Sequence, residues 1–279
     1  GFNKYLITFI SLLFFYLFYL LIPVLYDKTW LQSNIERQLL KEFKINFSIS
    51  SNISYRILPA PHFLIKDSKI FKEDGEKISS LANIKNLKIF ISQKNFFDKE
   101  DLAFKYIKIN NANFSLLRGD LKLLKNLSGN KFSNKKIEIN KSNIFFKDNS
   151  DETITIIKIS NAFLLKDHIN LLNLFELEGE VFNIPFSFDY KKDFESLEEE
   201  VNIIANTLKL NIFDTYIEGI DSFNNRTNTI SFLNSKIKID YKIVDGVVIF
   251  KSNKSRIKHQ KIDYDGELSI NPFDLNLNI

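Results

Sequence analysis

The sequence predicts a mainly β protein that one N-terminal helix holds at a membrane. A short amphipathic helix follows this anchor, and the rest of the chain is expected to form an elongated, repetitive antiparallel sheet that could curl into an open groove. Three observations support this fold class: an uncharged apolar run over residues 5–26, a change of hydrophobic period from 3.6 to 2 from residue 45 onward, and alternation that continues to residue 279. We therefore expect an anchor over residues 1–27 and a β-rich extramembrane domain over residues 28–279.

The apolar run reads YLITFISLLFFYLFYLLIPVLY and contains no charged residue. A helix of this length measures about 33 Å, slightly more than the roughly 30 Å hydrocarbon core of a bilayer. Large apolar side chains favour insertion, and amphipathic aromatic rings favour the two membrane interfaces. The residues expected to contact the membrane are Tyr5, Phe14, Phe15, Leu20, Tyr26 and Trp30.

A cleaved secretory signal is the alternative reading of this run. Such a signal has a shorter apolar region, of about 7 to 15 residues, followed by a small-x-small cleavage site. Residues 23–27 offer no such site. The sequence therefore favours a retained anchor.

Charge alone does not orient this anchor. Lys4 precedes the run, whereas Lys28, Arg37, Lys41 and Lys44 follow it closely. The positive-inside count therefore does not favour an external C-terminal domain, although large domains often translocate despite such charges.

Residues 28–43 predict a short amphipathic helix. Leu31, Ile35, Leu39 and Phe43 recur at every fourth position and share one face. Such a helix could lie on the bilayer surface or cap the following sheet. We expect the second arrangement.

Alternating residues predict strands over most of the remaining chain. Pro59 and Pro61 interrupt the first pair, because proline supplies no backbone N–H, and a new strand is expected at about Phe63. Turns are expected at residues 191–193, 245–246 and 265–266, and a short helix at residues 120–129. Further strands are expected over residues 81–92, 102–117, 137–150, 157–167, 181–190, 201–213, 229–243, 247–251 and 262–270.

One internal sequence similarity suggests a repeated unit. The segments IKINNANF, starting at Ile107, and IEINKSNI, starting at Ile137, share a pattern of isoleucine and asparagine. We interpret them as successive hairpins, each of which buries its apolar side against the next. Chance similarity in a chain rich in Ile, Asn and Lys is the alternative.

Composition argues against several classes of function. The net charge is +4, from 38 basic and 34 acidic residues, and no basic tract suggests nucleic-acid binding. Cysteine is absent, and His62, His168 and His259 are too far apart for a local metal motif, so we expect each on the surface. The acidic stretch 193–200 is expected to be a solvated loop. Nothing in the sequence calls for an enzyme or a cofactor.

The region after the predicted anchor resembles the start of the AsmA family of bacterial envelope proteins. The resemblance rests on a strand that ends in Pro-x-Pro, at Pro59 and Pro61, followed by a strand that carries Asp-x-x-Ile, at Asp67 and Ile70. Arg118 and Gly119 fall where the family often has a conserved element, but the tryptophan of that element is missing. A second similarity lies near the end of the sequence, at Gly266, Pro272 and Phe273.

The resemblance implies a single-pass protein of the bacterial inner membrane whose bulk lies in the periplasm. It further implies a role in moving phospholipid between membranes or in outer-membrane assembly, with phospholipid acyl chains and other envelope proteins as partners. The alternative is a tethered scaffold whose strands close over their own core and leave no lipid groove. Because methionine is absent and residue 1 is glycine, we expect that the natural start is missing from this sequence. Because residues 275–279 still alternate, we also expect the natural chain to continue beyond residue 279.

Overall fold

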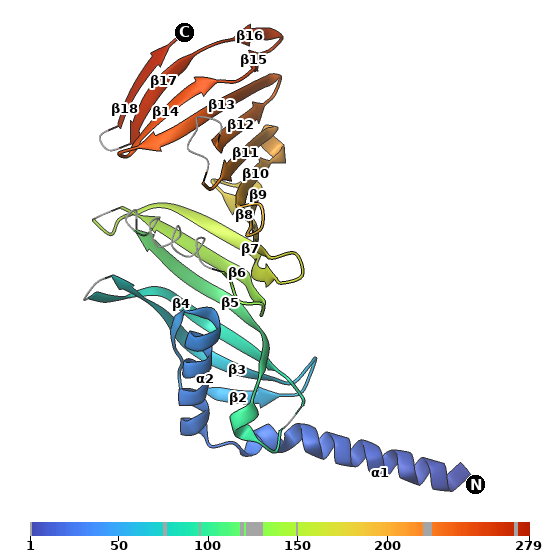
Figure 1. Cartoon of the computed structure of the whole chain (residues 1–279). Helices are drawn as coiled ribbons and strands as arrows, with labels where there is room; N and C mark the ends of the chain where they lie inside the picture. The colour runs from blue at the N-terminus through green and yellow to red at the C-terminus, as the bar shows by residue number, and fades with distance from the viewer. Residues whose placement is uncertain are drawn as a thin grey trace. The chain divides into compact units, whose positions relative to one another are not determined.

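A computed structural model describes residues 2–74, 77–94, 96–117, 120, 131–148, 150–219, 225–270 and 273–279. The described residues form a mainly β protein with one long N-terminal helix and eighteen strands, most of them antiparallel (Figure 1). The predicted fold class is therefore confirmed. The chain divides into two compact units, residues 1–121 with 135–155, and residues 122–134 with 156–279.

The first unit contains the helices and the strands that precede residue 148. Its elements are α1 (Phe2–Leu21), the 3₁₀ turn η1 (Ile22–Leu25), α2 (Lys28–Phe43), β1 (Asn46–Ser48), β2 (Ile53–Arg56), β3 (His62–Asp74), β4 (Lys77–Ile91), the 3₁₀ turn η2 (Lys99–Asp101), β5 (Phe104–Leu117) and β6 (Ile137–Lys147).

Helix α1 is exposed along most of its length. Residues 4–25 form a segment long and apolar enough to cross a membrane. Its large side chains, among them Tyr5, Phe14 and Phe15, face outward, whereas Leu20 is buried against the rest of the unit. No described residues cover most of the apolar surface of this helix, and the hydrocarbon core of a bilayer would cover it.

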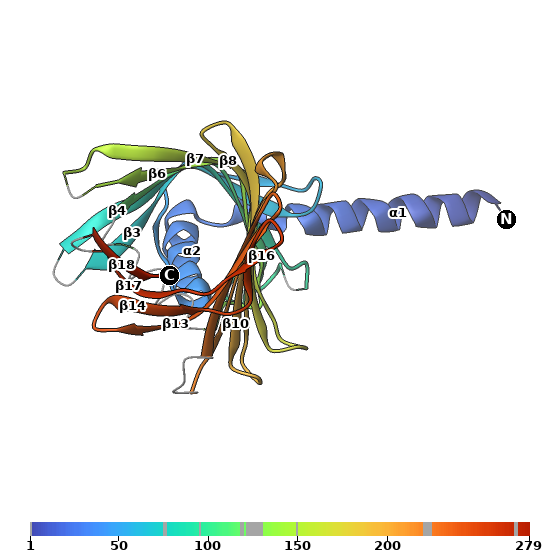
Figure 2. The same cartoon turned by 90° about the horizontal axis from the view of Figure 1, so that it is seen from above.

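Helix α2 covers one face of the sheet, as predicted (Figures 1 and 2). The Asp27 carboxylate caps its first turn by accepting the Trp30 N–H at 2.7 Å, and Lys44 ends it in the left-handed region at φ 58°. Ile35 and Leu39 on its inner face have no exposed surface. The amphipathic period of residues 28–43 therefore reports packing on the protein's own sheet.

Aligned aliphatic residues make the core of the first unit. Phe63, Ile89, Ile107 and Ile137 lie side by side across β3, β4, β5 and β6, and all four are buried. Strand alternation places every second residue on this face, so α2 and the sheet enclose a single apolar layer.

His62 is buried, which corrects the prediction of a surface residue. Its ring stacks on Phe90 at 4.8 Å, and Phe90 stacks on Tyr106 at 4.2 Å. The Nδ1 atom lies 2.7 Å from the Ala60 carbonyl oxygen. Burial lowers the pKa of His62, so the imidazole is neutral at pH 7. This burial could not be predicted from the local sequence, because the aromatic neighbours come from β4 and β5.

The two similar segments at residues 107 and 137 are neighbouring strands, but they do not form successive hairpins. Strands β5 and β6 pair in parallel, and Ile107, Asn110 and Asn113 lie beside Ile137, Asn140 and Asn143, respectively. The Asn143 side-chain amide donates to the Asn113 side-chain oxygen at 3.1 Å. Parallel pairing requires a crossover between the strands, so equivalent residues of the two copies become neighbours.

The second unit continues with hairpins. β7 (Thr153–Asp167) crosses the division between the units and belongs to the second from Ile156 onward. The following elements are β8 (Leu172–Val181), β9 (Ile184–Asp193), β10 (Glu198–Ala205), the 3₁₀ turn η4 (Asn206–Leu208), β11 (Leu210–Ile217), β12 (Arg226–Phe232), β13 (Ser235–Val244), β14 (Val247–Ser252), β15 (Ser255–Ile257), β16 (Gln260–Ile262), β17 (Asp265–Ile270) and β18 (Phe273–Asn278).

Three predicted strands of this unit are wrong in extent, and two strands, β8 and β15, were missed. The stretches 201–213 and 229–243 each contain a hairpin, β10–β11 and β12–β13. Their turns use Lys209 and Leu233 at φ 51°, without the glycine or proline that marks a turn in sequence. The turn expected at residues 265–266 and the strand expected over 262–270 also differ, because β16 ends at Ile262 and Gly266 lies inside β17.

The turn at residues 245–246 is confirmed, with Val244 paired to Val247. The turn expected at residues 191–193 lies instead at residues 194–197, after β9. The helix expected at residues 120–129 lies, apart from Asp120, outside the described residues.

Candidate functional site

The sheet of the second unit has one apolar face. Successive registers bring apolar residues of neighbouring strands side by side, from Ala162 in β7 to Ile237 in β13. We call this line the apolar row; its members are Ala162, Leu177, Phe188, Ile203, Ile212, Ile230 and Ile237. Because side chains alternate along a strand, all members project from the same face.

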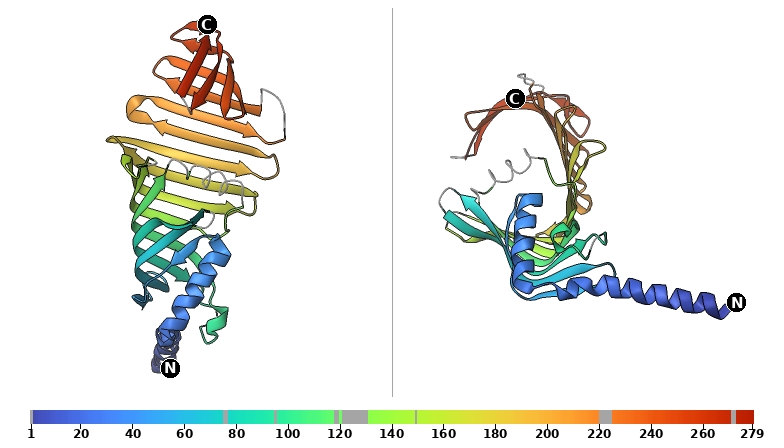
Figure 3. Two further views of the ribbon diagram at one scale, coloured as in Figure 1. Left: turned by 90° about the vertical axis from the view of Figure 1, so that its left-hand side faces the viewer. Right: turned by 60° about the horizontal axis from the view of Figure 1, so that its bottom comes forward.

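Side chains on both sides of the apolar row extend this surface. Val201 and Phe175 lie on the same face two residues away on their strands, as do Phe186 and Leu210. Most members of the row are half-buried, in contrast to the fully buried core of the first unit. The described residues of the second unit include no α-helix that could cover this face. The curvature of these strands is visible in Figure 3.

The opposite face is polar. Glu176, Glu178 and Glu180 alternate along β8, and Glu180 pairs with Lys158 at 2.8 Å. Lys191 and Glu200 form a further pair across β9 and β10 at 3.6 Å. The sheet therefore has one polar face that suits water and one apolar face that is more stable when apolar groups cover it.

A polar cluster interrupts the apolar face next to the row. The Asp214 carboxylate accepts hydrogen bonds from the Tyr241 hydroxyl at 2.9 Å and from the Asn228 amide at 3.0 Å. The Arg226 guanidinium lies 3.7 Å from the centre of the Tyr216 ring. Burial raises the pKa of Asp214, and burial together with the Asp214 carboxylate raises the pKa of Tyr241 to about 12. The cluster is satisfied internally and orders the strands that carry the row.

The pair Lys192 and Glu199 lies on the same face. The Lys192 ammonium is buried and lies 2.7 Å from the Glu199 carboxylate. The acidic stretch 193–200 is thus not a free loop, because Glu199 and Glu200 belong to β10 and pair with lysines of β9. This corrects the expectation from the sequence.

Gly266 shows why one residue of the family resemblance is a glycine. A Cβ atom at this position would lie 2.2 Å from the Asn276 carbonyl oxygen and 2.8 Å from Cζ of Phe250. Neither contact is possible for real atoms, so any side chain would push β18 or the Phe250 ring away. Glycine here allows Phe250, which is buried, to lie across the adjoining strand.

The other residues of the resemblance lie at turns and edges. Pro59 is exposed and Pro61 is buried between β2 and β3, so these prolines mark a turn as predicted. Phe273 is exposed in β18. Pro272, Arg118 and Gly119 lie outside the described residues.

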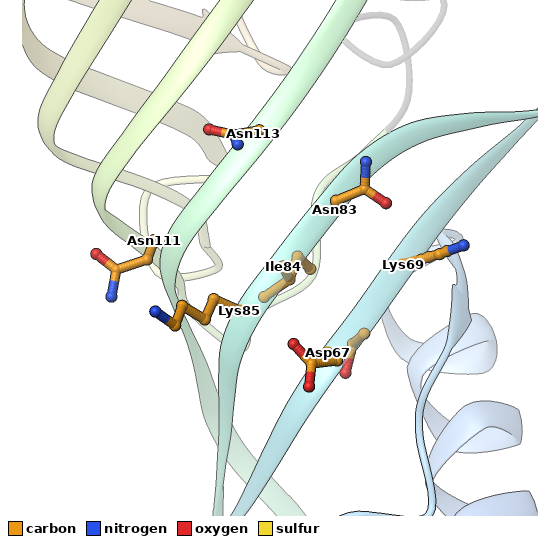
Figure 4. Close-up of a pocket in the computed structure, with 8 residues that line it drawn as sticks. Asp67, Lys69, Asn83, Ile84, Lys85, Asn111 and Asn113 are labelled. Atoms are coloured by element: carbon orange, nitrogen blue, oxygen red, sulfur yellow. The ribbon is translucent and has the colours of Figure 1, made fainter.

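Asp67 adopts φ 58° at a break in the pairing of β3 with β4. Lys66 pairs with Asn86 and Ser68 with Ile84, so the register is the same on both sides of the break and Asp67 lies opposite Lys85. Asn111, at φ 54°, lies at a similar break between β4 and β5. Figure 4 shows these side chains around an open hollow of about 430 Å³, together with Lys69, Asn83, Ile84 and Asn113. Its amide and charged groups are spread along the strands and form no catalytic arrangement.

The histidines and acidic residues form no metal centre within the part of the chain that the structure describes. His168 and His259 are exposed, as expected, whereas His62 is buried in the aromatic stack. Comparison with protein-family models and with curated proteins gives no match. The candidate site therefore rests on the apolar face itself.

Sequence reasoning missed the hydrogen bonds that fix the end of α1. Tyr19, Tyr26 and Tyr55 each use their hydroxyl group for a bond to a backbone carbonyl at 2.7 Å, of Gln93, Phe96 and Leu20, respectively. The predicted interface residues Tyr26 and Trp30 contact one another, with ring centres 6.0 Å apart. The two adjacent phenylalanines at residues 96–97 were the only signal in the sequence for a contact between this loop and the end of α1.

Proposed function

We propose that this chain is a membrane-tethered, non-enzymatic protein that handles phospholipid in the manner of the AsmA family. In this proposal α1 anchors it in the bacterial inner membrane, the bulk of the chain lies in the periplasm, and the apolar face of the second unit holds acyl chains. The observation that carries the proposal is the apolar row: seven apolar side chains, most of them half-buried, aligned across the seven strands β7 to β13, with no covering helix among the described residues.

Partition supplies the physical basis. Each methylene removed from water contributes about 0.8 kcal/mol, so an acyl chain of ordinary length gains several kcal/mol on such a surface. No bond is made or broken, and no catalytic group is needed. Because the contacts are non-directional and repeat from strand to strand, a chain could move along the row without crossing a large barrier.

A second candidate function is a tethered scaffold. Strand β18 pairs only with β17 among the described strands, and its residues are exposed throughout. An open strand edge can pair with a strand of another envelope protein. In that case the apolar face would hold no lipid.

Phospholipid bound to the purified full chain in detergent distinguishes the two functions. We expect Ile203→Lys to lower the number of phospholipids per chain, because a charge in the apolar row repels acyl chains. Asn202→Lys is the matched control, since Asn202 neighbours Ile203 on β10, projects from the polar face and pairs with Asp189. Both variants keep α1, so lipid held by the anchor cancels. Equal phospholipid in the two variants, with both folded by circular dichroism, would favour the scaffold.

A further inference from the structure

We propose that the first unit rests on the bilayer through a membrane foot, defined as the exposed side chains of Leu58, Phe97, Val24 and Leu25. The foot would insert into the lipid interface next to α1 and fix the tilt of the unit on the membrane. This inference rests on α1 crossing the bilayer and is independent of lipid handling by the second unit.

The loop after β4 is bonded to the end of α1. The Tyr19 hydroxyl donates to the Gln93 carbonyl oxygen at 2.7 Å and accepts the Phe96 N–H at 3.1 Å. The Tyr19 and Phe96 rings stack with centres 5.2 Å apart. The Tyr26 hydroxyl adds a bond to the Phe96 carbonyl oxygen at 2.7 Å. These contacts hold the loop against the C-terminal end of the helix.

The contacts also set the depth of the loop. Tyr19 lies within residues 4–25, the segment that is long enough to span a membrane. The Phe97 ring centre lies 5.5 Å from that of Tyr19. A side chain so close to a residue of the span must lie at the level of its last turns, which is where the hydrocarbon meets the headgroups.

The turn between β2 and β3 also lies near the end of α1. The Tyr55 hydroxyl donates to the Leu20 carbonyl oxygen at 2.7 Å, which holds β2 against the last turn of α1. Leu58 follows β2 by two residues and is 81% exposed, and Phe97 is 79% exposed. Large apolar side chains with this much exposure are unfavourable in water but suit a lipid interface.

The polar groups around the foot match an interface. Trp30 lies under the Lys99 ammonium, which is 4.9 Å from the ring centre, and such rings concentrate at the headgroup level. Burial raises the pKa of both Tyr26 and Tyr55, so their hydroxyl groups remain protonated donors. A bilayer is the occupant that fits, because the exposed foot is continuous with the apolar surface of α1.

Tryptophan fluorescence tests the foot, because Trp30 is the single tryptophan of the sequence. In the full chain carrying Trp30→Phe, we would introduce Phe97→Trp and reconstitute the protein in phosphatidylcholine vesicles with brominated acyl chains. Phe182→Trp is the matched control, since Phe182 is a phenylalanine of similar exposure, 76%, in a turn of the second unit. Phe14→Trp reports insertion of α1.

We expect the bromine to quench Phe97→Trp at least twofold more strongly than Phe182→Trp, and Phe14→Trp strongly. Leu58→Trp measures bromine quenching at the turn between β2 and β3, and it replaces Phe97→Trp if that variant does not fold. Quenching of Phe97→Trp and Leu58→Trp no greater than that of Phe182→Trp would overturn the proposal. Absence of quenching for Phe14→Trp would overturn it as well, by removing the span on which it rests.

Discussion

Leu39→Ala is expected to lower the free energy of unfolding of the first unit by about 2–5 kcal/mol. Leu39 has no exposed surface and lies on the buried face of α2, next to Ile35 in the core of the first unit. Removing three carbon atoms at this position loses their transfer free energy and leaves a cavity between helix and sheet. Urea unfolding of the full chain in detergent, followed by circular dichroism, measures the change.

Leu40→Ala is the matched control, because the neighbouring Leu40 is 50% exposed. The same atoms are removed on the outer side of α2, where little packing is lost. A free-energy change for Leu40→Ala as large as that for Leu39→Ala would contradict the assignment of the helix face and of the core.

Asp120→Asn is expected to cost the first unit about 3–5 kcal/mol, because it leaves the Lys72 ammonium buried without its partner. Lys72 and Asp120 form an ion pair in which both side chains are less than 10% exposed. The Asp120 carboxylate also accepts the Leu117 N–H at 2.8 Å, so the substitution disturbs the end of β5 as well.

Asp151→Asn provides the comparison within the same unit. Its ion pair with Lys147 spans 2.9 Å, but the Asp151 side chain is 76% exposed. Such a pair contributes about 0–1 kcal/mol. If thermal unfolding places the two variants at the same stability, the burial of the Lys72–Asp120 pair would be of no energetic consequence and the prediction would be wrong.

Much of the fold could be predicted because period and length are local properties. The apolar run of α1 and the four-residue spacing of Leu31, Ile35, Leu39 and Phe43 each specify an element and its buried face. Long alternating stretches did the same for β3, β4 and β5.

What failed depends on contacts between distant segments. The parallel pairing of β5 with β6 cannot be read from two similar strands, since the connection between them decides their direction. The hairpins β10–β11 and β12–β13 turn at Lys209 and Leu233, neither of which is a glycine or a proline that would mark a turn in the sequence. His62 is buried only because Phe90 and Tyr106 lie beside it.

A sheet with one apolar face was predicted, but the residues that form the apolar row were not. Alternation in the second half indicated a sheet with one apolar side, yet the apolar row exists only because each register aligns one aliphatic residue with the next, as in Ile203, Ile212 and Ile230. A shift of one residue in any hairpin would send that strand's aliphatic residues to the polar face. Register depends on turns, and the turns were the weakest part of the prediction.

Photo-crosslinking in cells tests lipid contact with the apolar face most directly. Benzoylphenylalanine would replace Phe188, a member of the apolar row, or Phe213, which lies on the opposite face of β11 and is 38% exposed. Both positions carry phenylalanine in the same unit, so the change in chemistry is the same. Lipid handling predicts phospholipid crosslinked at Phe188 and little at Phe213. Equal capture at the two positions, or none at Phe188, would contradict it.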